Sequence, residues 1–284
     1  MNTAQGNILI TGASTGIGKA TALHLDRLGF KVFAGVRRET DAAILTEAAS
    51  SGLVPVILDV TIEHTIAEVL DQVAARTGGT LDGLINNAGL SLNGPLELLP
   101  LSEIRALMEV NVLGLLAVTK ASIPLLRKGK GRLVNISSGH GLLAIPDKSA
   151  YAASKFALQA ISDSLRLELR PFGIQVTNLV VGKVDTDVLG KILAERDRLA
   201  QAADPEVLEL YAPLFEFFDR EVKNLPGIPP EDVAEVVARA LLAPKPKAEY
   251  LIGPGAKKMK NLARLPRGLR DFLMGKALYG GGQK

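Results

Sequence analysis

Short apolar runs recur along the chain, separated by longer stretches with a helical spacing of apolar residues. The runs are rich in Val and Ile and alternate little with polar residues, which is typical of strands buried on both faces of a parallel sheet. We therefore predict seven strands, at Asn7–Ile10, Lys31–Val36, Leu53–Leu58, Gly83–Asn86, Gly131–Ile136, Ile174–Val180 and Glu249–Ile252.

The stretches between these strands are long enough for crossover helices. Helices are predicted at 16–28, 40–50, 62–76, 102–128, 150–170 and 231–243. Because crossovers between parallel strands are right-handed, the helices cover both faces of the sheet. The predicted fold class is α/β, a single doubly wound Rossmann domain with a seven-stranded parallel sheet, and 284 residues can bury one such core.

Residues 1–256 are predicted to form this domain, with an insertion at 186–228 and an extension at 257–284. The insertion is rich in apolar side chains, namely Leu189, Ile192, Leu193, Leu199, Leu208, Tyr211, Leu214, Phe215, Phe217 and Phe218. Helices of this composition over an active-site mouth form a lid that excludes water and favours bulky apolar substrates. The alternative is a plain subunit interface or core helix.

The charge of the chain is unevenly distributed. The whole sequence has 33 basic and 30 acidic residues, a net charge of +3, and a pI near 9.0. Residues 257–284 hold eight basic residues against Asp271, so this extension carries +7 and the remainder carries −4. The body therefore lacks the basic character expected of a nucleic-acid binder.

Composition excludes further classes of protein. The chain has no Cys, which rules out disulfides, thiolate nucleophiles and Cys-based metal sites. Its three His residues are far apart and show no metal-ligand spacing, so no metal is expected. The N-terminus has no signal-peptide pattern and no apolar run approaches the roughly 20 residues that span a bilayer, so a cytoplasmic location is expected.

The first strand runs into a glycine-rich turn, Thr11-Gly12-Ala13-Ser14-Thr15-Gly16-Ile17-Gly18, and then into a helix. Residues without Cβ let backbone N–H groups and the positive end of the helix approach a pyrophosphate. This turn indicates a dinucleotide site, and the alternative is a tight turn that needs only positive φ.

The second strand ends in Arg37 and Arg38, where dinucleotide sites for NAD usually place an acidic residue. A guanidinium pairs with a 2′-phosphate that a carboxylate would repel. We therefore expect NADP(H) over NAD(H), unless the two arginines are only a solvated surface pair. Asp59, followed by Val60, ends the third strand and either reaches the adenine or caps the next helix.

Five motifs occur in a fixed order: the glycine turn, Asn86-Asn87-Ala88-Gly89, Asn111, Ser138, and Tyr151-Ala152-Ala153-Ser154-Lys155. In order and separation they resemble the classical short-chain dehydrogenase/reductase family over about residues 5–255. The apolar insertion and the C-terminal extension resemble those of the steroid- and retinol-dehydrogenase members of this family.

The resemblance implies that Asn111, Ser138, Tyr151 and Lys155 are catalytic. Tyr151 and Lys155 are four apart on a predicted helix and share one face. An ammonium lowers the pKa of a nearby phenol, so Tyr151 can exchange a proton with a carbonyl or alcohol oxygen. Ser138 is expected to hold that oxygen, Lys155 to bond the nicotinamide ribose as well, and Asn111 to distort its helix and hold a water leading to Lys155.

Further contacts follow from the resemblance. The expected cofactor contacts are Gly12, Ser14, Thr15, Gly16, Ile17, Gly18, Arg37, Arg38, Asp59, Val60, Asn87, Ala88, Gly89, Tyr151, Lys155, Gly182, Val184 and Thr186. Substrate is expected at Ser138, His140 and Tyr151, with His140 as pocket wall rather than catalyst. The family pattern departs at Val181, where a proline is usual, which puts the usual rigidity of that loop in doubt.

The implied function is NADP(H)-dependent hydride transfer between nicotinamide and a carbonyl or secondary alcohol, with a bulky apolar, steroid- or retinoid-like substrate. The alternative is a non-catalytic NADP(H)-binding sensor or scaffold. A homodimer or homotetramer through the helices at 102–128 and 150–170 is also implied. The basic extension, which Pro266-Arg267-Gly268 divides, lies on a membrane surface, on the acidic body or on another subunit.

Overall fold

The computed structural model describes residues 6–186, 188–224 and 226–280, with only the backbone described for Val188, Leu189, Lys191, Leu193 and 220–224. Seven parallel strands form one sheet in the order β3-β2-β1-β4-β5-β6-β7. The strands are β1 (Asn7–Ile10), β2 (Lys31–Val36), β3 (Leu53–Ile57), β4 (Gly83–Asn86), β5 (Arg132–Ser138), β6 (Gln175–Val181) and β7 (Glu249–Ile252). All seven predicted strands are confirmed.

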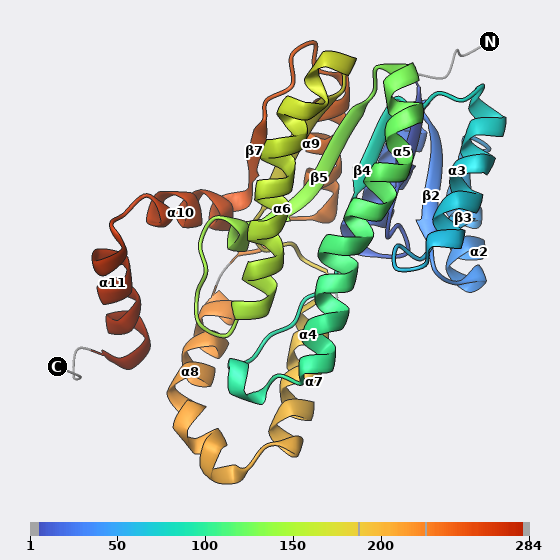
Figure 1. Ribbon diagram of the computed structural model, residues 1–284. Coiled ribbons are helices and arrows are strands. Elements are labelled where there is room, and N and C mark those ends of the chain that lie inside the picture. The colour runs from blue at the N-terminus through green and yellow to red at the C-terminus, as the bar shows by residue number, and fades with distance from the viewer. Residues whose placement is uncertain (1–5, 187, 225, 281–284) are drawn as a thin grey trace.

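The helices connect these strands and lie on both faces of the sheet, as Figure 1 shows. They are α1 (Gly16–Arg27), α2 (Glu39–Ala48), α3 (Glu63–Thr77), α4 (Leu101–Met108), α5 (Leu115–Gly129), α6 (Ser149–Glu168), α7 (Val188–Ala202), α8 (Pro205–Asn224), α9 (Pro230–Leu242), α10 (Gly253–Ala263) and α11 (Arg267–Tyr279). The predicted doubly wound Rossmann fold is therefore correct.

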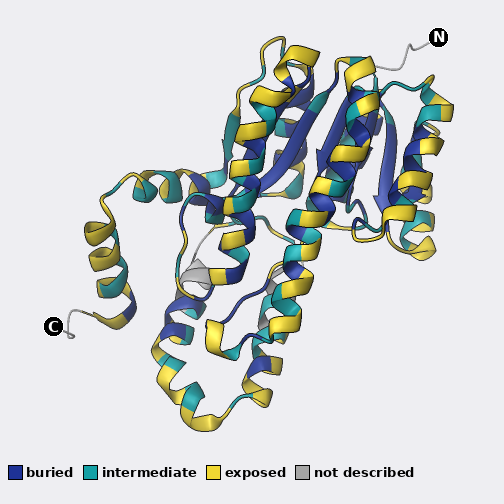
Figure 2. Cartoon of the chain, viewed as in Figure 1, coloured by how far each residue is buried: buried dark blue, intermediate teal, exposed yellow. Residues whose placement is uncertain are grey.

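Two apolar layers hold the sheet between its helices. One joins the strands to α1, α2 and α9 through residues such as Leu25, Leu45 and Val237. The other joins them to α3 and α5 through residues such as Val69 and Val118. Figure 2 shows the central strands as buried and the outer faces of the helices as exposed, the distribution that the near-continuous apolar strands predict.

The strand order reverses at β1, which pairs with β2 on one side and with β4 on the other. Loops leaving the carboxyl ends of β1 and β4 therefore diverge and open a crevice, the usual ligand position in open α/β sheets. The fifth strand runs two residues beyond its predicted end, because Ser137 and Ser138 pair with Val180 and Val181 of β6. Apolar periodicity missed this extension, since both added residues are serines.

The helix predicted over 102–128 is not a continuous α-helix. A π-helical turn at Glu109–Gly114 separates α4 from α5. The whole stretch Leu101–Gly129 is long and apolar enough to cross a membrane by length and composition. That corrects the expectation that no segment of the chain reaches this length. It is weak evidence for a span, because α5 packs with Val118 and Leu126 against the sheet, as a core helix does.

Helices α7 and α8 occupy most of the insertion 186–228. Helix α10 begins at Gly253, before the predicted start of the extension 257–284, and α11 follows it. The break between α10 and α11 falls at Pro266, where the sequence predicts an interruption. Leu278 of α11 is buried against Leu214, Phe217 and Phe218 of α8. In this structure one face of the extension is thus docked on the insertion, near the loop that carries Ile145.

Candidate active site

The glycine turn after β1 fits a pyrophosphate. Gly12 has φ +67, and a Cβ built there would lie 2.8 Å from the Ala88 Cα. A Cβ at Gly18 would lie 2.1 Å from the Gly12 carbonyl oxygen, so both positions require glycine. Helix α1 begins at Gly16 with no side-chain cap from Thr15 and no acidic residue in its first turn. Its first N–H groups are therefore available to an anion.

The motif after β4 holds this turn in place. The Asn87 side-chain amide donates to the carbonyls of Thr11 and Gly12 at 3.0 and 2.9 Å. The backbone N–H groups of Asn87 and Ala88 both donate to the Thr11 hydroxyl at 3.0 Å. Ser14, Thr15 and Ile17 lie in the turn itself, with Thr15 exposed. The ends of β1 and β4 are therefore joined by side-chain hydrogen bonds beneath the crevice.

The two arginines after β2 differ in their contacts. Arg38 forms an ion pair with Asp41 at 2.9 Å, which raises its pKa. Arg37 is exposed and has no hydrogen-bond or ion-pair partner among the described residues. Arg37 is thus the more available of the two to a phosphate. The Asp59 carboxylate accepts hydrogen bonds from the N–H and hydroxyl of Thr61, at 2.9 and 2.7 Å.

Asp59 therefore stabilises the turn that precedes α3, whose own N-cap residue is Ile62 and has no side-chain cap. Val60 is buried against the π-helical turn, and a Cβ built at Gly114 would lie 2.7 Å from its Cγ2. An adenine contact of Asp59, as expected from the sequence, would use the same carboxylate that holds this turn.

Ser138 ends β5 at the carboxyl edge of the sheet, and its hydroxyl accepts a hydrogen bond from the His140 N–H at 3.3 Å. Tyr151 lies in the first turn of α6. Burial raises the pKa of Tyr151, and its hydrogen bond with Ser138 opposes that increase. The structure therefore brings the serine hydroxyl and the phenol together, although they come from different elements.

Lys155 is one turn beyond Tyr151 on α6 and is 8% exposed. Its Nζ donates to the Ile136 carbonyl at 3.1 Å and lies 5.8 Å from the centroid of the Tyr151 ring. Burial lowers the pKa of Lys155 to about 8. A buried ammonium close to the phenol ring favours the phenolate, but burial still leaves the pKa of Tyr151 above its ordinary value in this structure.

Asn111 lies inside the π-helical turn between α4 and α5. Its side chain accepts from the Leu90 N–H at 2.7 Å and donates to the Leu90 carbonyl and the Ser154 hydroxyl at 2.9 and 3.0 Å. A Cβ built at Gly89 would lie 3.3 Å from Asn111 Oδ1 and 3.8 Å from Lys155 Nζ. Asn111 and Lys155 therefore flank the same short backbone segment, as π-helical turns at functional sites often allow.

His140 packs edge-on against Tyr151, with ring centroids 5.8 Å apart. Burial and the nearby Lys148 lower the pKa of His140 to about 4, so the imidazole is neutral at pH 7. Its Nδ1 has no hydrogen-bond partner among the described residues. The same residues contain no group of three or more His, Asp and Glu side chains arranged to hold a metal ion.

The loop after β6 closes the crevice from the other side. The Gly182 N–H donates to the Ile252 carbonyl at 2.9 Å. Val184 forms a parallel bridge with Ile228, which anchors the loop to the start of α9. A Cβ built at Gly16 would lie 3.3 Å from Thr186 Cγ2, so Thr186 lies beside the start of α1. The predicted cofactor residues of both loops therefore meet.

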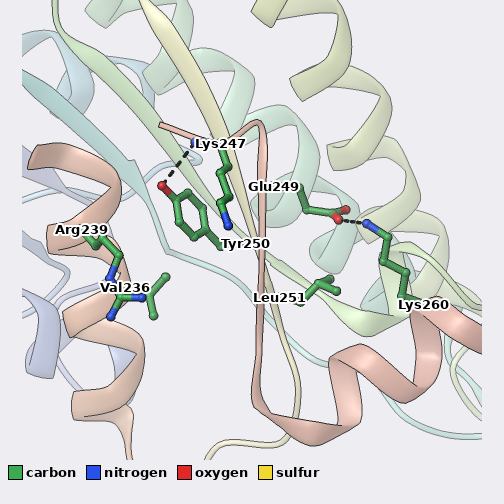
Figure 3. A pocket seen from close by; sticks show the side chains of 7 residues that line it. All are labelled: Val236, Arg239, Lys247, Glu249, Tyr250, Leu251 and Lys260. Atoms are coloured by element: carbon green, nitrogen blue, oxygen red, sulfur yellow. Dashed lines mark hydrogen bonds and ion pairs between the residues drawn. The ribbon is translucent and has the colours of Figure 1, made fainter. Parts of the chain in front are cut away.

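Two pockets lie away from these groups. One, of about 380 Å³, lies at the open edge of β7 (Figure 3) and is lined by Val236, Arg239, Lys247, Glu249, Tyr250, Leu251 and Lys260. Its charges are partly satisfied, because Lys260 pairs with Glu249. The other, of about 320 Å³, lies between α7, α8 and residues 97–100. Neither pocket is lined by a predicted catalytic residue. The candidate active site is therefore defined by the buried groups around Ser138 and Tyr151, and not by pocket volume.

Sequence reasoning missed several residues next to the catalytic groups. Met259 of α10 lies over the turn Gly139–Gly141 that follows Ser138, and a Cβ built at Gly139 would be 2.5 Å from the Met259 sulfur. Asn93, Lys148 and Glu195 form a partly buried polar cluster beside α6. No periodicity or motif marks any of them, because each contact joins segments that are distant in the sequence.

Comparison with known proteins agrees with this geometry. The short chain dehydrogenase family model matches residues 6–197. Retinol dehydrogenase 5 from Mus musculus is 36% identical over 259 residues, which cover 88% of this chain and 81% of the mouse protein.

Solved structures agree as well. A short-chain dehydrogenase from Streptomyces avermitilis has a TM-score of 0.78, 28% identity and 100% coverage of both chains. A short chain dehydrogenase from Burkholderia cenocepacia in complex with NADP has a TM-score of 0.72 and 25% identity, covering 96% of this chain and 99% of that chain. With its ordered motifs and its doubly wound sheet, this chain belongs to the short-chain dehydrogenase family of oxidoreductases.

Proposed function

We propose that this protein is an NADP(H)-dependent oxidoreductase that interconverts a ketone or aldehyde and the corresponding alcohol. The observation that carries the proposal is the meeting of Ser138, Tyr151, Lys155 and Asn111 at the carboxyl edge of the sheet, opposite the glycine turn. A non-catalytic NADP(H) sensor or scaffold is disfavoured, because it has no need of a proton donor placed beside an oxygen-binding hydroxyl.

In this proposal the nicotinamide cofactor supplies or accepts the hydride when it is bound. Ser138 donates a hydrogen bond to the substrate oxygen and orients it. In the reductive direction Tyr151 donates its phenolic proton to that oxygen as negative charge develops there. The Lys155 ammonium stabilises the phenolate left on Tyr151, and Asn111 holds the backbone of Leu90 beside Lys155.

We propose NADP(H) rather than NAD(H), with Arg37 as the main contact for the 2′-phosphate. Support comes from the unpaired, exposed Arg37 guanidinium and from the lack of an acidic side chain at the end of β2. The NADP complex of the Burkholderia cenocepacia relative is consistent with this choice. Arg38 plays a minor part, because Asp41 already occupies its guanidinium.

We propose a bulky apolar substrate, of the steroid or retinoid type, covered by the lid at 186–228. Leu199 of α7 packs with Leu92, Leu99 and Ala150 in a cluster that reaches Tyr151. An apolar wall beside the proton donor favours an apolar ketone, aldehyde or alcohol. The likeness to retinol dehydrogenase 5 points in the same direction.

The remaining expectations concern assembly and location. A homodimer or homotetramer is supported by exposed apolar side chains on α5 and α6, among them Leu116, Phe156 and Leu167. Sedimentation of the purified protein measures that state. We propose a cytoplasmic location with peripheral membrane contact through the basic extension, and the exposed side chains of Phe272 and Leu273 on α11 support the membrane contact. Binding to anionic vesicles that disappears in F272S tests the membrane contact.

The proposed activity is tested by measuring NADPH oxidation with steroid, retinoid, fatty and quinone carbonyls, each repeated with NADH. We expect turnover of at least one bulky apolar carbonyl and faster turnover with NADPH. Tight NADPH binding without turnover of any carbonyl in the panel, and without oxidation of the matching alcohols by NADP⁺, would contradict the catalytic proposal.

A further inference from the structure

A partly buried polar cluster connects the lid to the segment that carries the catalytic tyrosine. The Glu195 carboxylate on α7 accepts hydrogen bonds from the Asn93 backbone and side chain at 3.3 and 3.0 Å. The Lys148 ammonium donates to the side-chain oxygen of the same Asn93. One amide, whose residue is 0% exposed, therefore joins a carboxylate of the lid to an ammonium of the catalytic domain.

The catalytic end of this bridge lies close to Tyr151. Lys148 is the N-cap residue of α6, and its carbonyl accepts the Ala152 N–H at 2.7 Å. Tyr151 lies in the same first turn, so the bridge ends next to the proposed proton donor. The loop before Lys148 is held as well, because the Gly94 N–H donates to the Asp147 carbonyl at 2.9 Å.

The lid end of the bridge has an apolar companion. Leu199 lies one turn after Glu195 on α7, so the two side chains share a face. Leu199 is buried with Leu92, Leu99 and Leu107 in the cluster that borders Tyr151. Helix α7 thus contacts the wall of the catalytic site through one polar and one apolar side chain.

The charged groups around the bridge differ in burial: Asp147 is buried, and Lys148 and Glu195 are partly buried. The Lys148 ammonium lies near the charged groups of Asp147, Glu195 and Arg196. Its positive charge also lowers the pKa of His140. Burial lowers the pKa of Lys148 and raises that of Glu195, and it raises the pKa of Asp147 to about 6. Asp147 Oδ1 has no partner among the described residues, and Asp147 has φ +66. Buried polar networks stabilise a structure only when their members are satisfied, so removal of one member is costly.

We infer that Asn93, Lys148 and Glu195 are positioning residues that hold the lid helix α7 closed over Tyr151 and thereby set the affinity for bulky substrates. The inference rests on the proposed oxidoreductase function for its kinetic readout only. When Glu195 is replaced by alanine, the Asn93 amide loses its hydrogen-bond acceptor. Leu199 then loses the neighbouring polar contact that helps to hold α7 in place. The lid wall then opens toward solvent, and a substrate that needs this wall binds more weakly. A small carbonyl compound, which contacts Ser138 and Tyr151 alone, depends on the bridge much less.

The test compares Glu195→Ala, Glu195→Gln and Asn93→Ala with the unaltered protein. For a bulky apolar carbonyl found in the NADPH screen, we expect Glu195→Ala and Asn93→Ala each to raise KM about tenfold. For a small water-soluble ketone, kcat/KM changes by less than about twofold. Glu195→Gln keeps an acceptor for the Asn93 amide and restores most of the affinity. The double variant is expected to lose less affinity than the sum of the two single losses, because the side-chain hydrogen bond between Asn93 and Glu195 is removed in both.

Arg198→Ala is the matched control. Arg198 lies on the same helix and pairs with Glu103 at 2.7 Å, but this pair is partly exposed to solvent. Ion pairs that are partly exposed contribute little to stability, so we expect KM for the bulky carbonyl to stay unchanged. Equal effects of Arg198→Ala and Glu195→Ala would overturn the inference, because they would show that any change on α7 has the same result.

Amide hydrogen exchange of α7 provides a readout that does not depend on activity. We expect faster exchange in Glu195→Ala and Asn93→Ala, and native exchange in Glu195→Gln and Arg198→Ala. If no carbonyl is reduced by the unaltered protein, the proposed function fails and the exchange result still decides the bridge. Native exchange of α7 in both alanine variants would overturn the inference even in an active enzyme.

Discussion

The catalytic edge of the sheet and the lid with its extension differ in what holds their side chains in place. Ser138 is fixed by a strand register, since β5 pairs with β6 up to Val181. Lys155 is fixed by a hydrogen bond to the Ile136 carbonyl in the same strand. Helices α7 and α11 have no strand beside them and are held by side chains such as Leu199 and Leu278.

This difference separates the residues proposed to carry out the reaction from the residues proposed to select the substrate. Backbone hydrogen bonds in a sheet form a cooperative unit, so the catalytic groups keep their geometry when one side chain changes. Contacts through a few side chains open locally at a lower free energy. Alterations of the lid should therefore change which substrate is accepted, while alterations at the sheet edge should change whether any reaction occurs.

The largest effect is expected at the sheet edge. Tyr151→Phe removes the proposed proton donor and leaves the ring in place, so kcat should fall about 10³-fold with NADPH affinity unchanged. Steady-state kinetics and fluorescence titration of NADPH measure the two quantities. Tyr250→Phe, on β7, is the control and should behave as the unaltered protein. Retained turnover in Tyr151→Phe would contradict the assignment of the proton donor.

The next effect concerns the cofactor at the other end of the same edge. Arg37→Asp places a carboxylate where we propose a 2′-phosphate, so NADPH affinity should fall about 100-fold while NADH affinity changes little. Arg38→Asp should have a smaller effect, because Asp41 already neutralises Arg38. Equal losses for both cofactors in Arg37→Asp would show that Arg37 does not bind the phosphate.

A smaller effect should appear in the pH dependence. Lys155 has a pKa lowered to about 8 by burial, so its ammonium is present below that pH and is lost as the pH rises through it. Ketone reduction uses the ammonium, and kcat/KM for reduction should be flat from about pH 6 to 7.5 and decline above about 8. Lys155→Arg keeps its charge and should lack this decline. A decline at the same pH in that variant would assign it to another group.

The smallest effect on catalysis is expected from the extension. Leu278→Ala removes a buried side chain from the contact between α11 and α8, and should weaken the docking of α11 by about 2 kcal/mol. Phe272→Ala, on the exposed side of α11, should change stability by less than about 0.5 kcal/mol. Hydrogen exchange of α11 measures both. Similar exchange in the two variants would contradict the docked arrangement.

Sequence periodicity predicted the strands well because most of them are short runs buried on both faces, while the edge strands β3 and β7 are partly exposed. It placed the end of β5 two residues early, since Ser137 and Ser138 are polar, and the sheet register included them nonetheless. It also predicted the break in the extension at Pro266, whose ring cannot continue a helix. Asn111 drew notice only through its low helix propensity and the family pattern, and the form of the distortion, a π-helical turn, came from packing.

The sequence by itself determined the doubly wound sheet, the glycine turn and the family, because these depend on local spacing and on motifs a few residues long. Only the tertiary structure decided that Asn93 joins Lys148 to Glu195, that Met259 lies over Gly139, and that α11 docks on α8. Such contacts join side chains from distant segments. No local pattern records them, since they arise only when the folded sheet brings those segments together.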